Sequence, residues 1–150
     1  MAESHAIGRM AAPTLDAVAH CTEFAAAQAR AAGFGVARVH EIELVVEEIV
    51  ANICRYSYAD QIGSVELCCE RLDGETLALE FIDHGCAFNI LAMPDPDLSG
   101  DIDQRDVGGV GVPVLRALMD QASYRRDGAR NILRVIVHAA PRLGAEPTAT

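Results

Sequence analysis

The stretch EIELVVEEIVANICRYSY, residues 41–58, decides how the rest of the chain folds. Its apolar residues recur at steps of three and four, which is the spacing of one face of an α-helix. Together with the valine that precedes the stretch, they are Val39, Ile42, Val45, Val46, Ile49, Val50 and Ile53. This spacing predicts an amphipathic helix that packs on a core and runs to about Tyr58.

Glu48 and Asn52 stand four residues apart on this helix, so their side chains lie one above the other across one turn. A carboxylate and a neutral amide oxygen in this relation can accept a proton and ligate a hard cation such as Mg²⁺. An ordinary helix edge is the commoner explanation of a lone Glu–Asn pair. The choice between the two interpretations therefore depends on the motifs downstream.

Composition and charge exclude several classes of protein. The 150 residues suit one domain with one core, expected to be ordered over about residues 9–138, with a flexible tail at 141–150. No apolar run approaches the roughly 20 residues that cross a bilayer, and no signal peptide is visible, so we expect a cytoplasmic protein without a membrane partner. The net charge of −10 argues against nucleic acid as a partner.

The cysteines do not form a recognisable framework. There are five of them, an odd number, and no pair has the Cys-x-x-Cys spacing. We therefore expect neither a disulfide framework nor a zinc site, but reduced, half-buried small residues.

The order of elements predicts an α+β fold, a two-layer α/β sandwich with one mainly antiparallel, mixed sheet, because tight hairpins join antiparallel neighbours. Asp73-Gly74 and Asp127-Gly128 are the hairpin signals, and Gly33 is a helix stop. A long loop rich in aspartate and proline, residues 90–107, fits neither period and is typical of a functional segment. The remaining expected elements are a short edge strand at 6–11, a helix from Thr14 capped by Thr14 or Asp16, strands at 64–72, 76–82, 122–126 and 131–138, and a helix with Pro113 in its first turn.

Two glycine-bearing motifs follow the helix. In DHGCAFN, residues 83–89, the Asp83 carboxylate can accept a hydrogen bond from the exocyclic amine of adenine, and Gly85 lets the backbone approach the ring. An ordinary Asp-Gly turn explains the same residues when they are taken alone. In GGVG, Gly108, Gly109 and Gly111 precede a helix, whose free N–H groups can bind phosphate.

The joint order of these motifs is far more specific than any one of them. Glu-x-x-x-Asn on a helix, Asp-x-Gly-x-x-Phe after a hairpin and Gly-Gly-x-Gly before a helix resemble the nucleotide boxes of the GHKL ATPase superfamily, which has the Bergerat fold. Within it, the chain is similar to the anti-sigma-factor serine/threonine kinases of the RsbW type. The likeness spans roughly residues 9–138.

The resemblance implies a role for each matching residue, with ATP and Mg²⁺ as cofactors. Asn52 matches the asparagine that holds Mg²⁺, and Glu48 matches the general base that takes a proton from a partner's serine or threonine hydroxyl. Asp83 matches the acid that binds adenine, with Gly85 as its neighbouring glycine. The second glycine box, where the lid meets the phosphates, is matched by Gly108, Gly109 and Gly111.

The chain departs from the family pattern at two positions. Tyr56 stands where many relatives have a histidine and could alter the phosphate environment, and Ala87 replaces a glycine or proline. Arg105 stands where related kinases often place an arginine near the lid. It could reach a phosphate or a partner, although a solvated loop charge is an equal alternative.

The resemblance implies an ATP-dependent serine/threonine kinase that phosphorylates a STAS-domain antagonist and switches partners with a sigma factor or another target protein. It also implies a homodimer. Two alternatives stay open at this point. The chain could be an ATP-binding partner-switch module with weak or no catalysis, or a hydrolase or the detached ATP-binding part of a histidine kinase.

Overall fold

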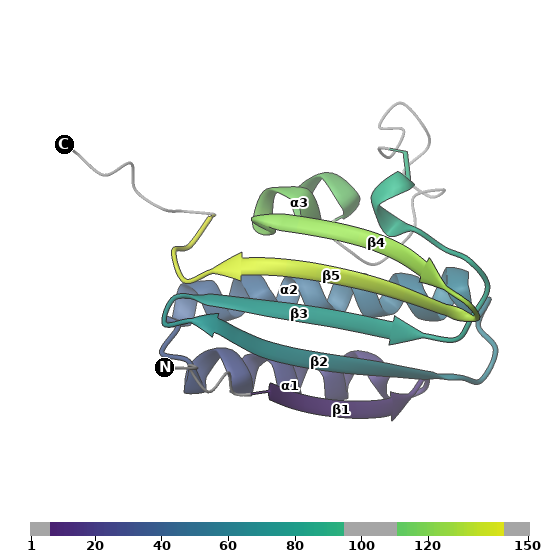
Figure 1. The fold of residues 1–150 in the computed structure, drawn as a ribbon, viewed down its shortest axis with the longest axis horizontal. Coiled ribbons are helices and arrows are strands. Elements are labelled where there is room, and N and C mark those ends of the chain that lie inside the picture. Colours follow the sequence, from purple (N-terminus) through teal and green to yellow (C-terminus); the bar gives the residue numbers. More distant parts are fainter. Residues whose placement is uncertain (1–6, 95–110, 143–150) are drawn as a thin grey trace, which may run out of the picture.

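The computed structural model describes residues 7–94 and 111–142, and its strands form one five-stranded antiparallel sheet (Figure 1). The order across the sheet is β1-β2-β3-β5-β4, and all four pairings among the described residues are antiparallel. The α+β fold class predicted from the sequence is confirmed. The strands are β1 Ile7–Pro13, β2 Ser64–Asp73, β3 Thr76–Asp83, β4 Gln121–Asp127 and β5 Arg130–His138.

The helices form the second layer, and α1 and α2 lie behind the sheet in the view of Figure 1. The helices are α1 Ala17–Ala31, α2 Val36–Asn52 and α3 Gly111–Leu118, with a π-helical turn η1 at Ile53–Ser57 and a 3-10 turn η2 at Ile90–Ala92. No helix within the described ranges is long and apolar enough to cross a bilayer. The expectations for Arg105, Gly108, Gly109, most of loop 90–107 and the tail after 142 lie outside these ranges.

The core lies between α2 and the sheet. Every apolar residue that defined the helix in the sequence is buried, with at most 5 % of its surface exposed. These residues meet inward side chains of the central strands, such as Leu67, Leu79 and Val135, which are fully buried. Each buried aliphatic side chain contributes about 1.5–3 kcal/mol. Side chains of α1 and α3, such as Cys21 and Leu115, belong to the same buried cluster.

The ends of the predicted helices differ from the sequence expectation in two details. Gly33 ends α1 as predicted, with a φ of +86°. Asp16 stands at the N-cap of α1, but its side chain makes no capping hydrogen bond. The other expected cap, Thr14, instead joins the chain before β2, since its Oγ1 accepts from the Gly63 N–H at 3.3 Å.

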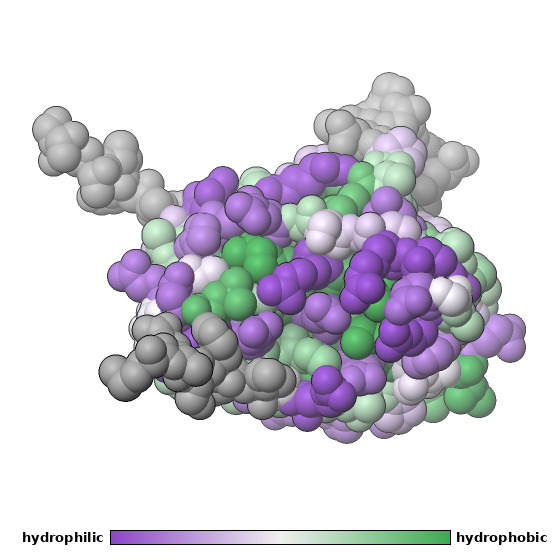
Figure 2. Space-filling model, viewed as in Figure 1, coloured by the Kyte–Doolittle hydropathy of each residue, from purple (hydrophilic) through white to green (hydrophobic). Residues whose placement is uncertain are grey.

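The face of the sheet that points away from the helices is polar. Arg134 on β5 lies 3.3 Å from Glu80 on β3 and 4.0 Å from Glu70 on β2, so it bridges three strands. On the edge strand, Arg9 lies 3.4 Å from Glu66. Figure 2 shows this face as a largely hydrophilic surface with smaller hydrophobic areas between the charged groups.

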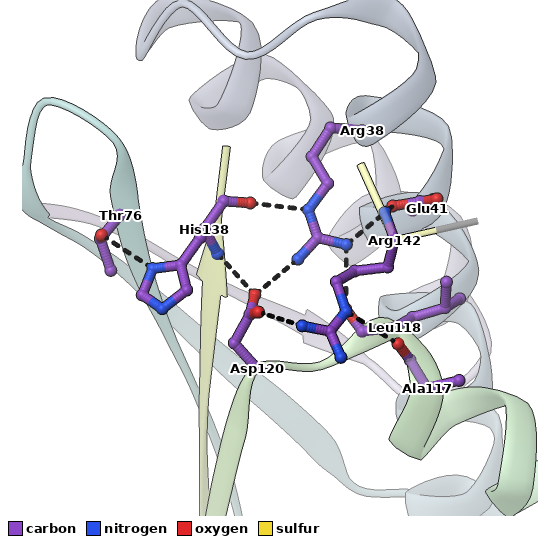
Figure 3. A network of polar contacts seen from close by, with 8 residues as sticks. All are labelled: Arg38, Glu41, Thr76, Ala117, Leu118, Asp120, His138 and Arg142. Carbon is purple, nitrogen blue, oxygen red and sulfur yellow. Dashed lines mark hydrogen bonds and ion pairs between the residues drawn. The ribbon is translucent and has the colours of Figure 1, made fainter. Parts of the chain in front are cut away.

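A buried arginine joins α2 to the C-terminal end of α3 (Figure 3). Arg38 has no exposed surface. Its Nη1 donates to the Glu41 carboxylate at 2.8 Å and to the Leu118 carbonyl at 2.9 Å. Its Nη2 donates to Asp120 at 2.9 Å and its Nε to the His138 carbonyl at 2.7 Å. The guanidinium thus satisfies a carbonyl at the end of α3, which would otherwise lack a partner.

Arg142 completes this cluster at the end of the described chain. Its backbone N–H donates to Glu41 at 2.8 Å, and its Nη1 donates to Asp120 at 2.9 Å. Its Nε donates to the Ala117 carbonyl at 3.3 Å. Two arginines and two carboxylates therefore balance their charges around the end of α3.

The cysteines are all free and differ mainly in burial. Cys21 and Cys69 are buried, and burial raises the pKa of each thiol to about 12. Burial also raises the pKa of Cys54 and Cys68, both of which are partly buried. Cys86 is exposed in the loop after β3.

Candidate nucleotide site

The candidate site begins where α2 widens into a π-helical turn. The Tyr58 N–H donates to the Ile53 carbonyl at 3.2 Å, a step of five residues in place of four. Ala59 and Asp60 then adopt positive φ values of 49° and 62°, which end the helix abruptly. π-helical turns inside α-helices occur frequently at functional sites.

The turn η1 lies directly against the loop that follows β3. The Ser57 carbonyl accepts a hydrogen bond from the Cys86 N–H at 2.8 Å. A Cβ atom added to Gly85 would lie 2.4 Å from the same carbonyl oxygen, which is a severe overlap with backbone. Gly85 is therefore required for the approach of two backbone segments, a reason that the motif alone did not reveal.

Glu48 and Asn52 lie beside each other as their spacing predicts. Asn52 Nδ2 donates to the Glu48 carboxylate at 3.1 Å and to the Glu48 carbonyl at 2.7 Å. Because a backbone carbonyl can only accept, Nδ2 must point toward it. Asn52 Oδ1 is then the atom left for a cation, since no donor among the described residues reaches it.

Asp83 is the last residue of β3 and has only 1 % of its surface exposed. Its Oδ1 accepts from the Gly85 N–H at 3.0 Å and from Asn131 Nδ2 at 2.9 Å. Asn131 stands directly opposite it on β5. Within residues 7–94 and 111–142, no donor is bound to Asp83 Oδ2, so this oxygen can accept from a ligand.

One pocket joins α2 to Asp83. It has a polar end, formed by Asp83 and Asn131, and mostly apolar walls. Its remaining lining residues are Ile49, Ile53, Phe81, Phe88, Ile90, Tyr124 and Leu133. Ile49 and Ile53 directly follow Glu48 and Asn52 in the sequence, but Glu48 and Asn52 themselves do not line this pocket. A few polar groups set among apolar walls are the lining typical of a small-molecule site.

Tyr56 packs against Phe88, one of the residues that line the pocket. Its ring stacks on Phe88 with 5.3 Å between the ring centres, and the Arg55 guanidinium lies 5.4 Å from the Tyr56 ring centre. The Tyr56 carbonyl also accepts from the Cys86 thiol at 3.3 Å. The expectation that Tyr56 alters the phosphate environment is not tested by these contacts, which instead join it to the loop after β3. Ala87 in that loop is exposed.

The second glycine box is described only from Gly111, which begins α3. Pro113 lies in the first turn of this helix, as the sequence predicts. Arg116 on α3 donates to the Leu91 carbonyl in η2, so the two elements that flank residues 95–110 are joined. The positions of Arg105, Gly108 and Gly109 lie outside the described residues.

Three residues of the site were not singled out in the sequence. They are Asn131, Tyr124 and Ser57, and all contact the Asp83 loop or its partners. Nothing near them in the sequence marks them. To predict the role of Asn131 from the sequence, one would need the register of β3 against β5, which pairs it with Asp83, 48 residues away.

The comparisons with known proteins concern the family and the fold of the chain. The sequence profile of the histidine kinase-like ATPase domain matches residues 11–137. The fold is similar to a crystal structure of the RsbU and RsbW domains of Rv1364c from Mycobacterium tuberculosis, with a TM-score of 0.58 and 13 % sequence identity. That match covers 91 % of this chain and 33 % of the other, so this chain spans about a third of its length. No curated protein matches the chain.

The fold is an α+β domain with helices on one face of an antiparallel sheet. The profile match covers well over half of the sequence. The chain therefore belongs to the family of histidine kinase-like ATPase domains, and the resemblance to the GHKL superfamily is confirmed. ATP is the ligand that this family implies.

Proposed function

We propose that this protein is an ATP-dependent serine/threonine kinase of the anti-sigma-factor type, which phosphorylates a STAS-domain antagonist and exchanges it for a sigma factor or another target. The observation that carries the proposal is the contact between Glu48 and Asn52. The two side chains are hydrogen-bonded at 3.1 Å, and the next residue after each lines the pocket that contains Asp83.

The side-chain oxygens of Asn52 and Asp83 suit Mg²⁺ and adenine, the ligands that the family implies. Asn52 Oδ1 and the oxygens of a bound triphosphate are the hard ligands that Mg²⁺ prefers. Asp83 Oδ2 can accept from the adenine amino group, while Phe88 and the apolar side chains of α2 cover the ring. From their match to the glycine box, Gly108, Gly109 and Gly111 would bind the phosphates. Arg105, which precedes the box where related kinases often have an arginine, would lie near the lid.

Bound Mg²⁺·ATP would supply the phosphoryl group. Glu48 would accept the proton of the partner's hydroxyl as its oxygen forms a bond to the γ-phosphorus and the bond to ADP breaks. Asn52 would hold the carboxylate of Glu48 in place through its Nδ2. Such transfer depends mainly on positioning and charge neutralisation, and a general base contributes about 10²- to 10⁴-fold.

The test is transfer of labelled γ-phosphate from Mg-ATP to a STAS-domain protein from the same genome. We expect acid-stable phosphoserine or phosphothreonine on the partner, and a loss of at least about a hundredfold in Glu48→Gln with ATP binding retained. Glu47→Gln is the matched control, because Glu47 is the adjacent glutamate and is exposed. Equal rates in both variants would contradict the assignment of the base.

Other outcomes would identify the alternatives. Nucleotide binding and nucleotide-dependent capture of a partner without transfer would indicate a switch module that does not catalyse. Acid-labile phosphate on a histidine would instead indicate the detached ATP-binding part of a histidine kinase. A sedimentation measurement at several protein concentrations would test the proposed homodimer.

A further inference from the structure

Asn131 is a buried amide in the wall of the pocket, and its backbone partners fix its orientation. Its Oδ1 lies 3.1 Å from the Phe88 N–H, a group that can only donate. Its Nδ2 lies 2.7 Å from the Cys86 carbonyl, which can only accept. Exchanging the two ends of the amide would create two repulsive contacts, so the Nδ2 end must face Asp83.

Tyr124 on β4 holds this orientation from the other side. Its hydroxyl lies 2.6 Å from Asn131 Oδ1, and since that oxygen can only accept, the hydroxyl donates. A chain of hydrogen bonds therefore runs from Tyr124 through Asn131 to Asp83 Oδ1, which lies 2.9 Å from Asn131 Nδ2. The Gly85 N–H supplies a second donor to the same oxygen at 3.0 Å.

We propose that Tyr124 and Asn131 are positioning residues that set the base specificity of the pocket by holding Asp83 as a hydrogen-bond acceptor. The pocket then selects a purine with a 6-amino group, such as adenine, over one with a 6-oxo group. This inference rests on the proposed function, in which Asp83 Oδ2 accepts a hydrogen bond from the amino group of adenine.

The selection follows from the donors already bound to Asp83. A 6-amino group donates and pairs with Oδ2, whereas a 6-oxo group directs its lone pairs at those of the carboxylate. A site built for a donor strongly rejects an analogue that lacks it, because a buried polar group is left without a partner. Two donors on Oδ1 also prevent the carboxyl group from rotating to present a different edge.

Asn131 acts through Asp83. Its strongest donor contacts, at 2.9 Å and 2.7 Å, go to Asp83 and to the Cys86 carbonyl. A longer contact of 3.4 Å reaches Ser57 Oγ. With only 3 % of its surface exposed, Asn131 has no N–H directed to a base.

The test compares the dissociation constants of ADP and IDP, which differ at the 6-position of the base, by calorimetry with Mg²⁺ present. We expect the wild type to prefer ADP by at least about a hundredfold. Asn131→Leu keeps a similar volume without hydrogen bonds and should reduce that preference about tenfold or more. Tyr124→Phe removes only the hydroxyl and should reduce it about threefold to tenfold.

Tyr58→Phe is the matched control. Its hydroxyl donates to the Ser64 carbonyl at 2.6 Å and accepts from the His84 N–H at 2.8 Å, without contact to Asn131. It should leave the ratio of the two constants unchanged. If Asn131→Leu does not fold, Tyr124→Phe decides the question.

The outcomes separate this inference from the proposed function. If both variants bind ADP and IDP more weakly by the same factor, the preference for ADP is unchanged. That result would overturn the inference alone and leave the kinase proposal standing. A wild type that binds ADP and IDP equally would also overturn it. A wild type that binds neither nucleotide would contradict the proposed function, and the inference would fail with it.

Discussion

Replacing Arg38 by methionine should be among the most destabilising single changes in this chain. The substitution keeps an unbranched apolar stem but removes all four hydrogen bonds that the guanidinium makes. Glu41 and Asp120 would keep their charges with fewer partners, in a site where their side chains are at most 9 % exposed. Breaking one partner out of a buried ionic network costs about 3–5 kcal/mol.

This loss is large compared with the roughly 5–15 kcal/mol that stabilises a typical domain. Urea denaturation followed by circular dichroism should therefore show a much lower midpoint for Arg38→Met, with the same slope. The urea midpoint of Arg38→Lys should lie between those of the wild type and Arg38→Met. One ammonium group cannot replace a planar guanidinium with several N–H donors.

Arg130→Met is the matched control. Among the described residues, Arg130 pairs with Asp127 alone, at 2.7 Å, and the two side chains are 42 % and 51 % exposed. An exposed pair of this kind contributes about 0–1 kcal/mol. If the free energies of unfolding of the Arg38→Met and Arg130→Met variants agree within 1 kcal/mol, burial of the cluster does not determine its contribution and the reasoning is wrong.

Three further predictions concern Gly85 and the cysteines. Gly85→Ala should abolish nucleotide binding or folding, because its Cβ would lie 2.4 Å from a backbone carbonyl oxygen. Gly74→Ala is the control, since a Cβ there has no neighbour within 4 Å, and equal melting temperatures of the two variants would contradict this. A thiol reagent at pH 8 should modify Cys86 first, and early mass labels on Cys21 or Cys69 would count against their burial. The free energy of unfolding should fall between about pH 9 and about pH 12. In this range the Cys21 and Cys69 thiols lose their protons in the unfolded chain, where their pKa is 9.0, but keep them in the folded protein, where burial raises it to about 12. The decrease should be smaller in Cys69→Ala.

The parts of the fold that depend on local pattern were predictable from the sequence. The amphipathic face of α2 was visible because apolar residues recur at helical spacing, and all of them are buried. Both hairpins were visible from Asp-Gly pairs. The structure confirms the second one with a positive φ of 58° at Gly128 and closes the first through Asp73, which accepts from the Glu75 N–H at 2.7 Å.

The parts that depend on tertiary contacts were not predictable. Arg38 and Glu41 lie on α2 three residues apart, a spacing that in sequence fits an exposed ion pair, yet both are buried because α3 and the end of β5 cover them. Asn131 is one polar residue at the start of a strand, and its role depends on its pairing with Asp83 across the sheet. No sequence period marks a π-helical turn, so the widening at Ile53–Ser57 was read as plain helix.

The widened turn at Ile53–Ser57 also limits how this segment can change length. A hydrogen bond over five residues accommodates one more residue than an α-helical turn does. Deleting a residue there would restore ordinary helix without interrupting it, but would rotate everything downstream by about 100° around the axis. The Ser57 carbonyl would then turn away from the Cys86 N–H, so a deletion that is harmless to the helix would separate it from the adjoining loop.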